Sequence, residues 1–202
     1  MTKTEAEPVA SLRDHYQARF LAHGDHELAT QMSRAGQRFR FEKVFEIGDL
    51  TNARVLDLGC GLGDMYPLLL ERCPGVVYEG IDLVPEMTAH AAAKYPGIRF
   101  RAVDVLAETI TDRFDYVLMS VVFNNALPDA TEFLERLIER AFALAGKGLA
   151  FNFLSTYVNF RDAEMAYHDP ARVFDFCIRR LSRKVVVQHH YERCDVAMFV
   201  YP

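Results

Sequence analysis

The sequence has few of the features that mark a membrane protein or a disulfide-bonded secreted domain. No apolar run approaches the roughly 18 to 20 residues that a membrane span requires, and the first residues contain no apolar segment like that of a signal peptide. Only four cysteines occur, and none has the CxxC spacing of a zinc or redox site. We therefore expect a cytoplasmic protein with reduced thiols, no structural metal and no membrane contact.

The sequence also has no excess of positively charged residues. The chain has 23 lysines and arginines against 28 aspartates and glutamates, so its formal net charge is -5. Such a balance disfavours the broad phosphate-binding face of a nucleic-acid-binding protein, and we expect no nucleic-acid partner. Half of the 202 residues are apolar, which is enough for the core of one sizeable domain. Residues 1–202 are therefore predicted to form a single domain.

Short β-branched runs alternate with segments of helical period along the chain, which is typical of βαβ units and a parallel sheet. The last two of these runs are separated by too few residues for a helical crossover, so they are expected to pair as an antiparallel hairpin. The predicted fold class is α/β, with a seven-stranded, mostly parallel sheet, a C-terminal antiparallel hairpin and helices on both faces. The strands are predicted over residues 54–58, 76–81, 98–103, 114–119, 149–154, 185–189 and 196–201.

The clearest helix is predicted over residues 129–145, where apolar residues recur at helical spacing. Asp129 and Glu132 have the spacing of a capping box at the start of this helix. Gly146 directly follows the helix and is expected to stop it, because glycine is common just beyond helix ends.

Two further helices are predicted ahead of the first strand, around residues 11–21 and 37–47. These helices have no place in the sheet and are free to cover a ligand. Residues 1–50 are therefore predicted to form a helical cap on a core of residues 51–202.

A buried strand, a glycine turn and the start of a helix follow one another in the run VLDLGCGLGDM at residues 55–65. Glycine supplies the positive φ and the missing side chain that a close approach between backbone and ligand needs, and the helix N-terminus offers free N–H groups. The spacing of Gly59, Gly61 and Gly63 is GxGxG. A dinucleotide-binding GxGxxG would have its third glycine at Asp64, so the spacing argues against an NAD-dependent dehydrogenase.

Acidic residues stand at the ends of the next two predicted strands. Asp82 lies about twenty residues beyond the glycine turn, where a carboxylate can accept hydrogen bonds from both ribose hydroxyls. Asp104 ends the third strand. Both residues are expected along the crevice at the carboxyl ends of the strands, where open α/β sheets bind ligands.

The run VLDLGCGLGDM resembles motif I of the class I, Rossmann-like S-adenosylmethionine-dependent methyltransferases, and EGIDL, FRAVDV and FDYVLMSVVFNN are similar to the motifs that follow. The resemblance covers residues 54–154, and it implies a Rossmann-like sheet that binds S-adenosylmethionine and releases S-adenosylhomocysteine. It further implies that the glycine turn holds the methionyl part, that Asp82 binds the ribose, and that Asp104 and Val105 bind the adenine. The positions it assigns to the cofactor are Arg40, Asp57, Gly59, Cys60, Gly61, Asp82, Leu83, Asp104, Val105 and Ser120.

Arg40 belongs to an N-terminal segment that resembles the part folded over the cofactor in small bacterial members, where it could pair with the methionine carboxylate. Many members that modify amines or nucleobases carry an Asp/Asn-Pro-Pro-Tyr-like tetrad after the fourth strand. This chain lacks the tetrad and has Asn124 and Asn125 there, which argues against nucleobase methylation. The two asparagines either point at the methyl group or simply end the strand.

The segment over residues 155–170 is rich in aromatic residues and is long for a connection, so it is either an acceptor-binding loop or a surface loop with one short helix. Within it, His168 is a candidate general base or a solvated histidine, and Arg161 is a candidate anchor for an anionic acceptor. Asn124, Tyr157, Arg161 and His168 are therefore predicted to line an acceptor pocket above the methyl group, with Asn124, His168 and Arg161 as the catalytic candidates.

The function predicted from these features is methyl transfer from S-adenosylmethionine to an oxygen, nitrogen or carbon atom of a small molecule by in-line displacement. The sulfonium is already activated, so alignment supplies much of the rate and a carboxylate acceptor would need no base. Two alternatives remain, namely a regulatory or non-catalytic S-adenosylmethionine-binding protein and, less favoured, an RNA methyltransferase. The sequence indicates neither the acceptor nor the oligomeric state.

Overall fold

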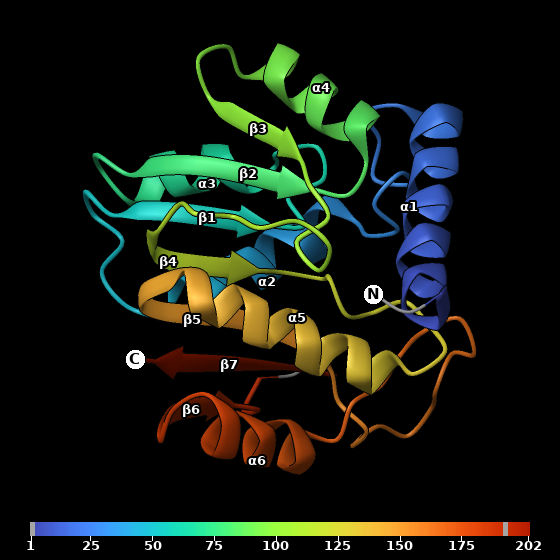
Figure 1. Ribbon diagram of the computed structural model, residues 1–202. Coiled ribbons are helices and arrows are strands. Elements are labelled where there is room, and N and C mark those ends of the chain that lie inside the picture. The colour runs from blue at the N-terminus through green and yellow to red at the C-terminus, as the bar shows by residue number, and fades with distance from the viewer. Residues whose placement is uncertain (1–2, 192–193) are drawn as a thin grey trace.

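Seven strands form one sheet in a computed structural model that describes residues 3–191 and 194–202 (Figure 1). In chain order the strands are β1 (Arg54–Leu58), β2 (Val77–Asp82), β3 (Arg99–Ala102), β4 (Phe114–Met119), β5 (Ala145–Leu154), β6 (Lys184–Gln188) and β7 (Asp195–Tyr201). The helices of the described residues are α1 (Lys3–His23), α2 (Arg34–Phe45), α3 (Met65–Arg72), α4 (Pro85–Lys94), α5 (Ala130–Leu144) and α6 (Pro170–Arg180). None of these helices is long and apolar enough to cross a membrane.

The strand order in the sheet is β3-β2-β1-β4-β5-β7-β6. The strands β1 to β5 pair in parallel, and β7 runs antiparallel between β5 and β6. The prediction of a mostly parallel α/β sheet that ends in an antiparallel hairpin is thereby confirmed. Because the parallel strands share one direction, the carboxyl ends of β1, β2 and β4 lie at one edge of the sheet, where such folds bind ligands.

The start and the end of α5 differ from the prediction. Asp129 has a left-handed backbone with φ of 54°, and its side chain makes no capping hydrogen bond, so the predicted capping box is wrong. Aspartate tolerates this conformation better than most residues do. The helix ends at Leu144 and the chain continues directly into β5, where Ala145 pairs with Phe114 of β4. Gly146 therefore lies inside the strand and does not stop the helix.

Helices cover both faces of the sheet and create two apolar layers (Figure 1). On one face, Leu134 of α5 packs in a buried cluster with Phe151 and Phe153 of β5. On the other face, Val44 of α2 and Leu69 of α3 belong to a second buried cluster. The helix α1 stands apart from both layers, at the end of the molecule toward which β1, β2 and β4 point.

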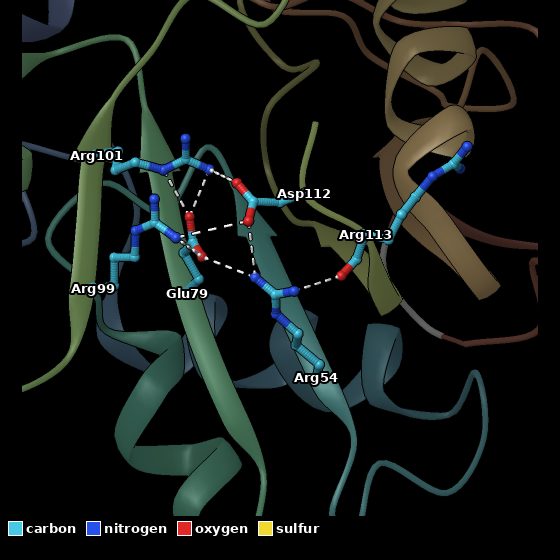
Figure 2. Close-up of polar contacts among 6 residues, drawn as sticks. All are labelled: Arg54, Glu79, Arg99, Arg101, Asp112 and Arg113. Atoms are coloured by element: carbon cyan, nitrogen blue, oxygen red, sulfur yellow. Dashed lines mark hydrogen bonds and ion pairs between the residues drawn. The ribbon is translucent and has the colours of Figure 1, made fainter. Parts of the chain in front are cut away.

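Charged side chains occupy the part of the sheet surface formed by β1, β2 and β3 on the α5 side (Figure 2). The connection from β3 to β4 contains no helix in the described part of the chain, so no helix from it covers these strands. Glu79 is buried there and accepts hydrogen bonds from Arg101 at 2.7 Å and from Arg99 at 3.3 Å. Arg54 and Arg101 also pair with Asp112. The arginine stems and their two carboxylates thus shield this face in place of a helix.

Candidate active site

A pocket is lined by residues at the carboxyl ends of β1, β2 and β4 and by residues of α1. The helix α1 lies across this end of the sheet (Figure 1). The volume of the pocket is about 1070 Å³ when the space at its open mouth is counted. The lining comes from the strand ends, from the turns that follow them, and from the segment that contains α1 and α2, with further residues from α4 and α5. Such a concave, largely preformed cavity is the usual setting for a small-molecule site.

The glycine turn after β1 forms the floor of the pocket. Gly59 and Gly61 line the pocket and have positive φ values of 84° and 52°. The N–H of Gly59 donates to the carbonyl oxygen of Ile81 at 2.7 Å, which ties the turn to β2. A Cβ atom on Gly59 would lie 2.6 Å from Cγ2 of Val122, so the turn after β1 directly contacts the turn after β4. Only glycine fits at position 59 without displacing that turn.

Asp82 at the end of β2 presents a fixed carboxylate to the pocket. The N–H of Gly61 donates to its Oδ2 atom at 2.8 Å, and the N–H of Val84 donates to its Oδ1 atom at 3.0 Å. Burial raises the pKa of Asp82, although the two N–H donors oppose the rise. Each carboxylate oxygen has a second lone pair, so this side chain can accept two hydroxyl groups of a ligand.

Asp57 lies deeper, in the last part of β1. Its side chain is buried, lines the pocket and accepts a hydrogen bond from the Tyr78 hydroxyl at 2.7 Å. Burial raises the pKa of Asp57 from 3.8 to about 7, and the nearby charge of Asp82 adds to the rise. Burial also raises the pKa of the Cys60 thiol, which therefore stays protonated. A cationic ligand in the pocket would restore the charge on Asp57.

The remaining positions that the sequence assigned to the cofactor divide into two groups. Leu83, Asp104, Val105 and Ser120 line the pocket together with the residues described above. Arg40 is not among the lining residues.

Arg40 instead forms an ion pair with Asp195 at the start of β7. Its Nε and Nη2 atoms donate to the two carboxylate oxygens at 2.7 and 2.8 Å. The Asp195 side chain is only 1% exposed, and a buried carboxylate without a partner would be strongly destabilising. The structure therefore corrects the prediction for Arg40, because its guanidinium is already bound within the protein and holds α2 against the sheet.

The predicted acceptor pocket of Asn124, Tyr157, Arg161 and His168 is not formed, since none of the four lines the cavity. Tyr157 is 69% exposed. Arg161 is exposed as well, with its guanidinium over the ring of Tyr167 and a hydrogen bond to the carbonyl oxygen of Thr156. These two side chains point away from the site, so the anchoring role of Arg161 is corrected.

His168 and Asn124 are buried outside the cavity. The Nε2 atom of His168 lies 3.1 Å from the carbonyl oxygen of Phe123, and burial lowers the pKa of this histidine. The N–H of Ala166 donates to the carbonyl oxygen of Asn124, and Met165 forms a bridge with Asn125. The long segment after β5 thus pairs part of its backbone with the segment after β4, and none of its described residues lines the pocket.

The cover contributes lining residues that the sequence analysis missed. These are Val9, Leu12 and Tyr16 of α1, whereas Gln37 and Phe41 of α2, which also line the pocket, belong to the segment that already resembled a cover for the cofactor in the sequence. Positions 9, 12 and 16 share one face of a helix, which was the available signal, but the predicted helix began only at residue 11.

Hydrogen bonds hold α1 over the pocket. The hydroxyl of Tyr16 donates to Oδ1 of Asn125 at 2.6 Å, and Nδ2 of Asn125 donates to Oε1 of Gln31 at 3.2 Å. Burial raises the pKa of Tyr16 to about 12, so its hydroxyl remains a donor at neutral pH. Asn125, one of the two asparagines after β4, therefore links α1 and the segment before α2 to the sheet.

A buried amide supports the turn that follows β4. Asn152 of β5 is 1% exposed, and its Oδ1 atom accepts a hydrogen bond from the N–H of Val121 at 2.8 Å. Its Nδ2 atom donates to Oγ of Ser120 at 3.0 Å. Ser120, Val121 and Val122 all line the pocket. The amide therefore connects the centre of the sheet to a wall of the site.

Comparison with known proteins places these features in a family. A family model described as a methyltransferase domain matches residues 55–142. Rv1506c of Mycobacterium tuberculosis, a protein with a provisional methyltransferase name, is 36% identical over 151 residues, which cover 71% of this chain and 90% of the relative. Trans-aconitate 2-methyltransferase of Rhizobium meliloti is 34% identical over 93 residues, or 46% of this chain. The chain spans only 36% of the length of that enzyme.

Solved structures show the same fold at lower sequence identity. A DhpI complex with S-adenosylhomocysteine has a TM-score of 0.71 and 17% identity, with 96% of this chain and 97% of that chain covered. Magnesium protoporphyrin IX methyltransferase of Synechocystis PCC 6803 with bound S-adenosylmethionine has a TM-score of 0.68 and 17% identity, with 95% of each chain covered. The match to Rv1506c, together with the glycine turn and the strand order of this fold, identifies the chain as a member of the class I S-adenosylmethionine-dependent methyltransferases.

Proposed function

We propose that this enzyme methylates a small, largely apolar acceptor that carries no net negative charge and binds beneath α1 and α2. The observation that carries the proposal is the charge of the pocket lining. Asp57, Asp82 and Asp104 contribute three carboxylates, whereas Arg13 is the only cation among the described lining residues. Arg13 is exposed and pairs with Asp14, so the carboxylates dominate the field inside the pocket.

This charge fits the cofactor. S-adenosylmethionine has a sulfonium, an ammonium and a carboxylate, so its net charge is positive and an acidic pocket attracts it. In our proposal the turn at Gly59 and Gly61 accommodates the methionyl part, Asp82 accepts the ribose hydroxyls, and Asp104 with Val105 contacts the adenine. The fixed N–H donors to Asp82 support its role, because they preorganise the carboxylate for two hydroxyl groups.

The remaining wall fits an acceptor of low polarity. Val9, Leu12 and Phe41 from the cover are buried, and they face the pocket together with Tyr16 and Gln37. Two polar side chains among apolar ones can orient one functional group of a small molecule. A polyanionic acceptor would have to enter a cavity that already contains three carboxylates, which opposes its binding electrostatically.

The chemistry follows from this arrangement. The bound cofactor supplies an activated methyl group, so the protein has to align the acceptor atom with it and exclude water. The apolar cover performs the second task. Tyr16 stays protonated at neutral pH and donates its hydroxyl hydrogen to Asn125, so its oxygen can accept a hydrogen bond from a ligand but cannot serve as a base. We therefore propose an acceptor atom that is nucleophilic without assistance from a basic side chain.

We also propose that residues 1–50 act as a cap on a core of residues 51–202 and that the two work as one domain. The lining residues of α1 and α2 support this division, since both helices contribute side chains to a cavity whose floor belongs to the core. The oligomeric state does not enter the proposal.

The acceptor class is tested with S-adenosylmethionine that carries a labelled methyl group. Trans-aconitate, which the relatives named trans-aconitate 2-methyltransferase act on, is a tricarboxylate and serves as the anionic probe. A panel of simple heteroaromatic amines and thioethers, which have a free lone pair in their neutral forms, serves as the neutral apolar probe. We expect label transfer to members of the neutral panel and none to trans-aconitate. Transfer to trans-aconitate alone would contradict the proposal.

A further inference from the structure

Val121 has a backbone conformation that is unusual for its residue type. Among the described non-glycine residues, positive φ values occur at Gln31, Asn52, Val121 and Asp129, and Val121 is the only β-branched one of the four. Its φ is 68°. A β-branched side chain makes the left-handed conformation costly, and such strain persists only where the surrounding structure imposes it.

The surrounding structure that imposes this conformation is the buried carboxamide of Asn152. It accepts the hydrogen bond of the Val121 N–H and donates to the Ser120 hydroxyl, as described above. Nδ2 also lies 3.4 Å from the carbonyl oxygen of Arg40 in α2. One side chain in β5 thereby fixes two consecutive residues after β4 and touches the cover.

The turn at Ser120 and Val121 lies between the glycine turn after β1 and the part of the pocket that α2 lines. In the sheet β1 lies between β2, which carries Asp82, and β4, which leads into the turn. The close approach between Gly59 and Val122 shows that the turn adjoins the glycine floor on the side away from Asp82. Gln37 and Phe41 of α2 line the same cavity from the cover. A methyl group between the cofactor and an acceptor under α2 would face this turn.

We propose that Asn152 is a positioning residue for methyl transfer, because it holds Ser120 and Val121 in the strained turn that contacts the reactive methyl group of the cofactor. The inference rests on the cofactor placement in the proposed function, but not on the identity of the acceptor. The turn offers the Ser120 hydroxyl oxygen and backbone carbonyl oxygens, and a methyl group on a sulfonium is polarised enough to form C–H···O contacts with such oxygens. The turn therefore favours S-adenosylmethionine over S-adenosylhomocysteine, which has no such methyl group.

The test measures the affinities of both compounds by calorimetry in the full chain. Asn152→Leu removes the amide at similar size, and we expect the preference for S-adenosylmethionine over S-adenosylhomocysteine to fall about threefold, the range of one or two weak hydrogen bonds. The double variant with Val121→Gly should recover part of the preference and of the Tm, because glycine adopts positive φ without strain. Equal losses for both compounds, or no recovery in the double variant, would show that Asn152 is only structural.

Two further variants keep the test decisive if Asn152→Leu does not fold. Ser120→Ala removes only a hydroxyl, and it should lower the preference for S-adenosylmethionine while the chain stays folded. An unchanged preference in that variant would overturn the proposal. Asn52→Gly is the matched control, since Asn52 also has a positive φ of 54° but does not line the pocket. It should change the Tm and leave the preference unaltered. Neither readout requires an acceptor, so a wrong acceptor class would not affect the outcome.

Discussion

The two halves of the pocket are built in different ways. The proposed cofactor half consists of the glycine turn after β1 and of carboxylates within or close to the carboxyl ends of β1, β2 and β3, so each residue is placed by its own strand. The acceptor half consists of side chains from α1 and α2, which are placed by contacts with distant parts of the chain. The link between Tyr16 and Asn125, for instance, joins residues 109 positions apart. The first half tolerates few substitutions, whereas the second can change while the cofactor site is kept.

The largest effect is expected from Gly59→Val, which should reduce S-adenosylmethionine affinity at least ~100-fold. The new side chain would have a strained φ and would collide with Val122. Calorimetry measures the loss, and Gly97→Ala is the matched control. Gly97 has a φ of 88° with nothing within 4 Å of the added Cβ, so that variant should lose stability but keep its affinity. Tight binding by the Gly59 variant would show that the turn is only a structural feature.

Removal of Asp82, the proposed ribose acceptor, should have the next largest effect. Asp82→Ala is expected to weaken S-adenosylmethionine binding by about 2 kcal/mol, or roughly 30-fold, because both hydroxyl groups lose a charged acceptor. Asp104→Ala is the comparison within the same half and should cost less, since the exocyclic amine of adenine has one hydrogen bond to lose there. The opposite ranking of the two variants would mean that the ribose and adenine positions are exchanged.

The affinity for S-adenosylmethionine should depend on pH through Asp57. Without ligand the pKa of Asp57 is about 7, so below neutral pH its carboxyl group has to lose a proton when a cationic cofactor binds. Affinity should therefore fall as the pH decreases from 7 to 5.5, by at most about tenfold per pH unit. Calorimetry in buffers of different ionisation enthalpy would detect the released proton. Asp57→Asn should abolish the dependence, and an unchanged pH profile in that variant would assign it to another group.

Without cofactor, the contribution of Asp57 to folding stability should change with pH in the opposite direction to its effect on cofactor affinity. Because the folded pKa of Asp57 lies above 3.8, the protonated carboxyl stabilises the fold, and this contribution is lost as the pH rises from about 4 through 7. The contribution of Asp57 to the free energy of unfolding should thus decline over this range without cofactor. Denaturation of the wild type and of Asp57→Asn with urea at several pH values would separate it from the other titrating groups.

The smallest effect is expected in the cover. Tyr16→Phe removes the hydrogen bond to Asn125 but keeps the ring, so the cofactor should dissociate about fivefold faster while the fold is retained. Stopped-flow measurement of dissociation provides the test. Tyr157→Phe is the control, because Tyr157 is exposed and does not line the pocket. Equal dissociation rates in both variants would mean that α1 is held by its apolar contacts alone.

The comparison of the two halves also explains how much could be predicted from the sequence. Strand ends and turns are local features, so the positions of Gly59, Asp82 and Asp104 at the carboxyl edge followed from spacing and from the direction of parallel strands. The order of the last two strands followed from the length of their connection. The prediction for residues 155–170 failed to place Arg161 and His168, because no local pattern indicates which other segment a long loop will pair with.

Sequence alone therefore determined the sheet, its hairpin and the placement of the glycine turn and the acidic residues at the carboxyl ends of the strands, because these depend on periodicity and on neighbours along the chain. The tertiary structure decided which side chains remained free to bind a ligand. Arg40 was a candidate ligand residue until β7 brought Asp195 to it across 155 positions, and the energy of a buried charge then fixed that pair. Asn152 shows no functional pattern in the sequence. It acquires its place in the site only because β5 lies beside β4 and buries the amide against a strained turn.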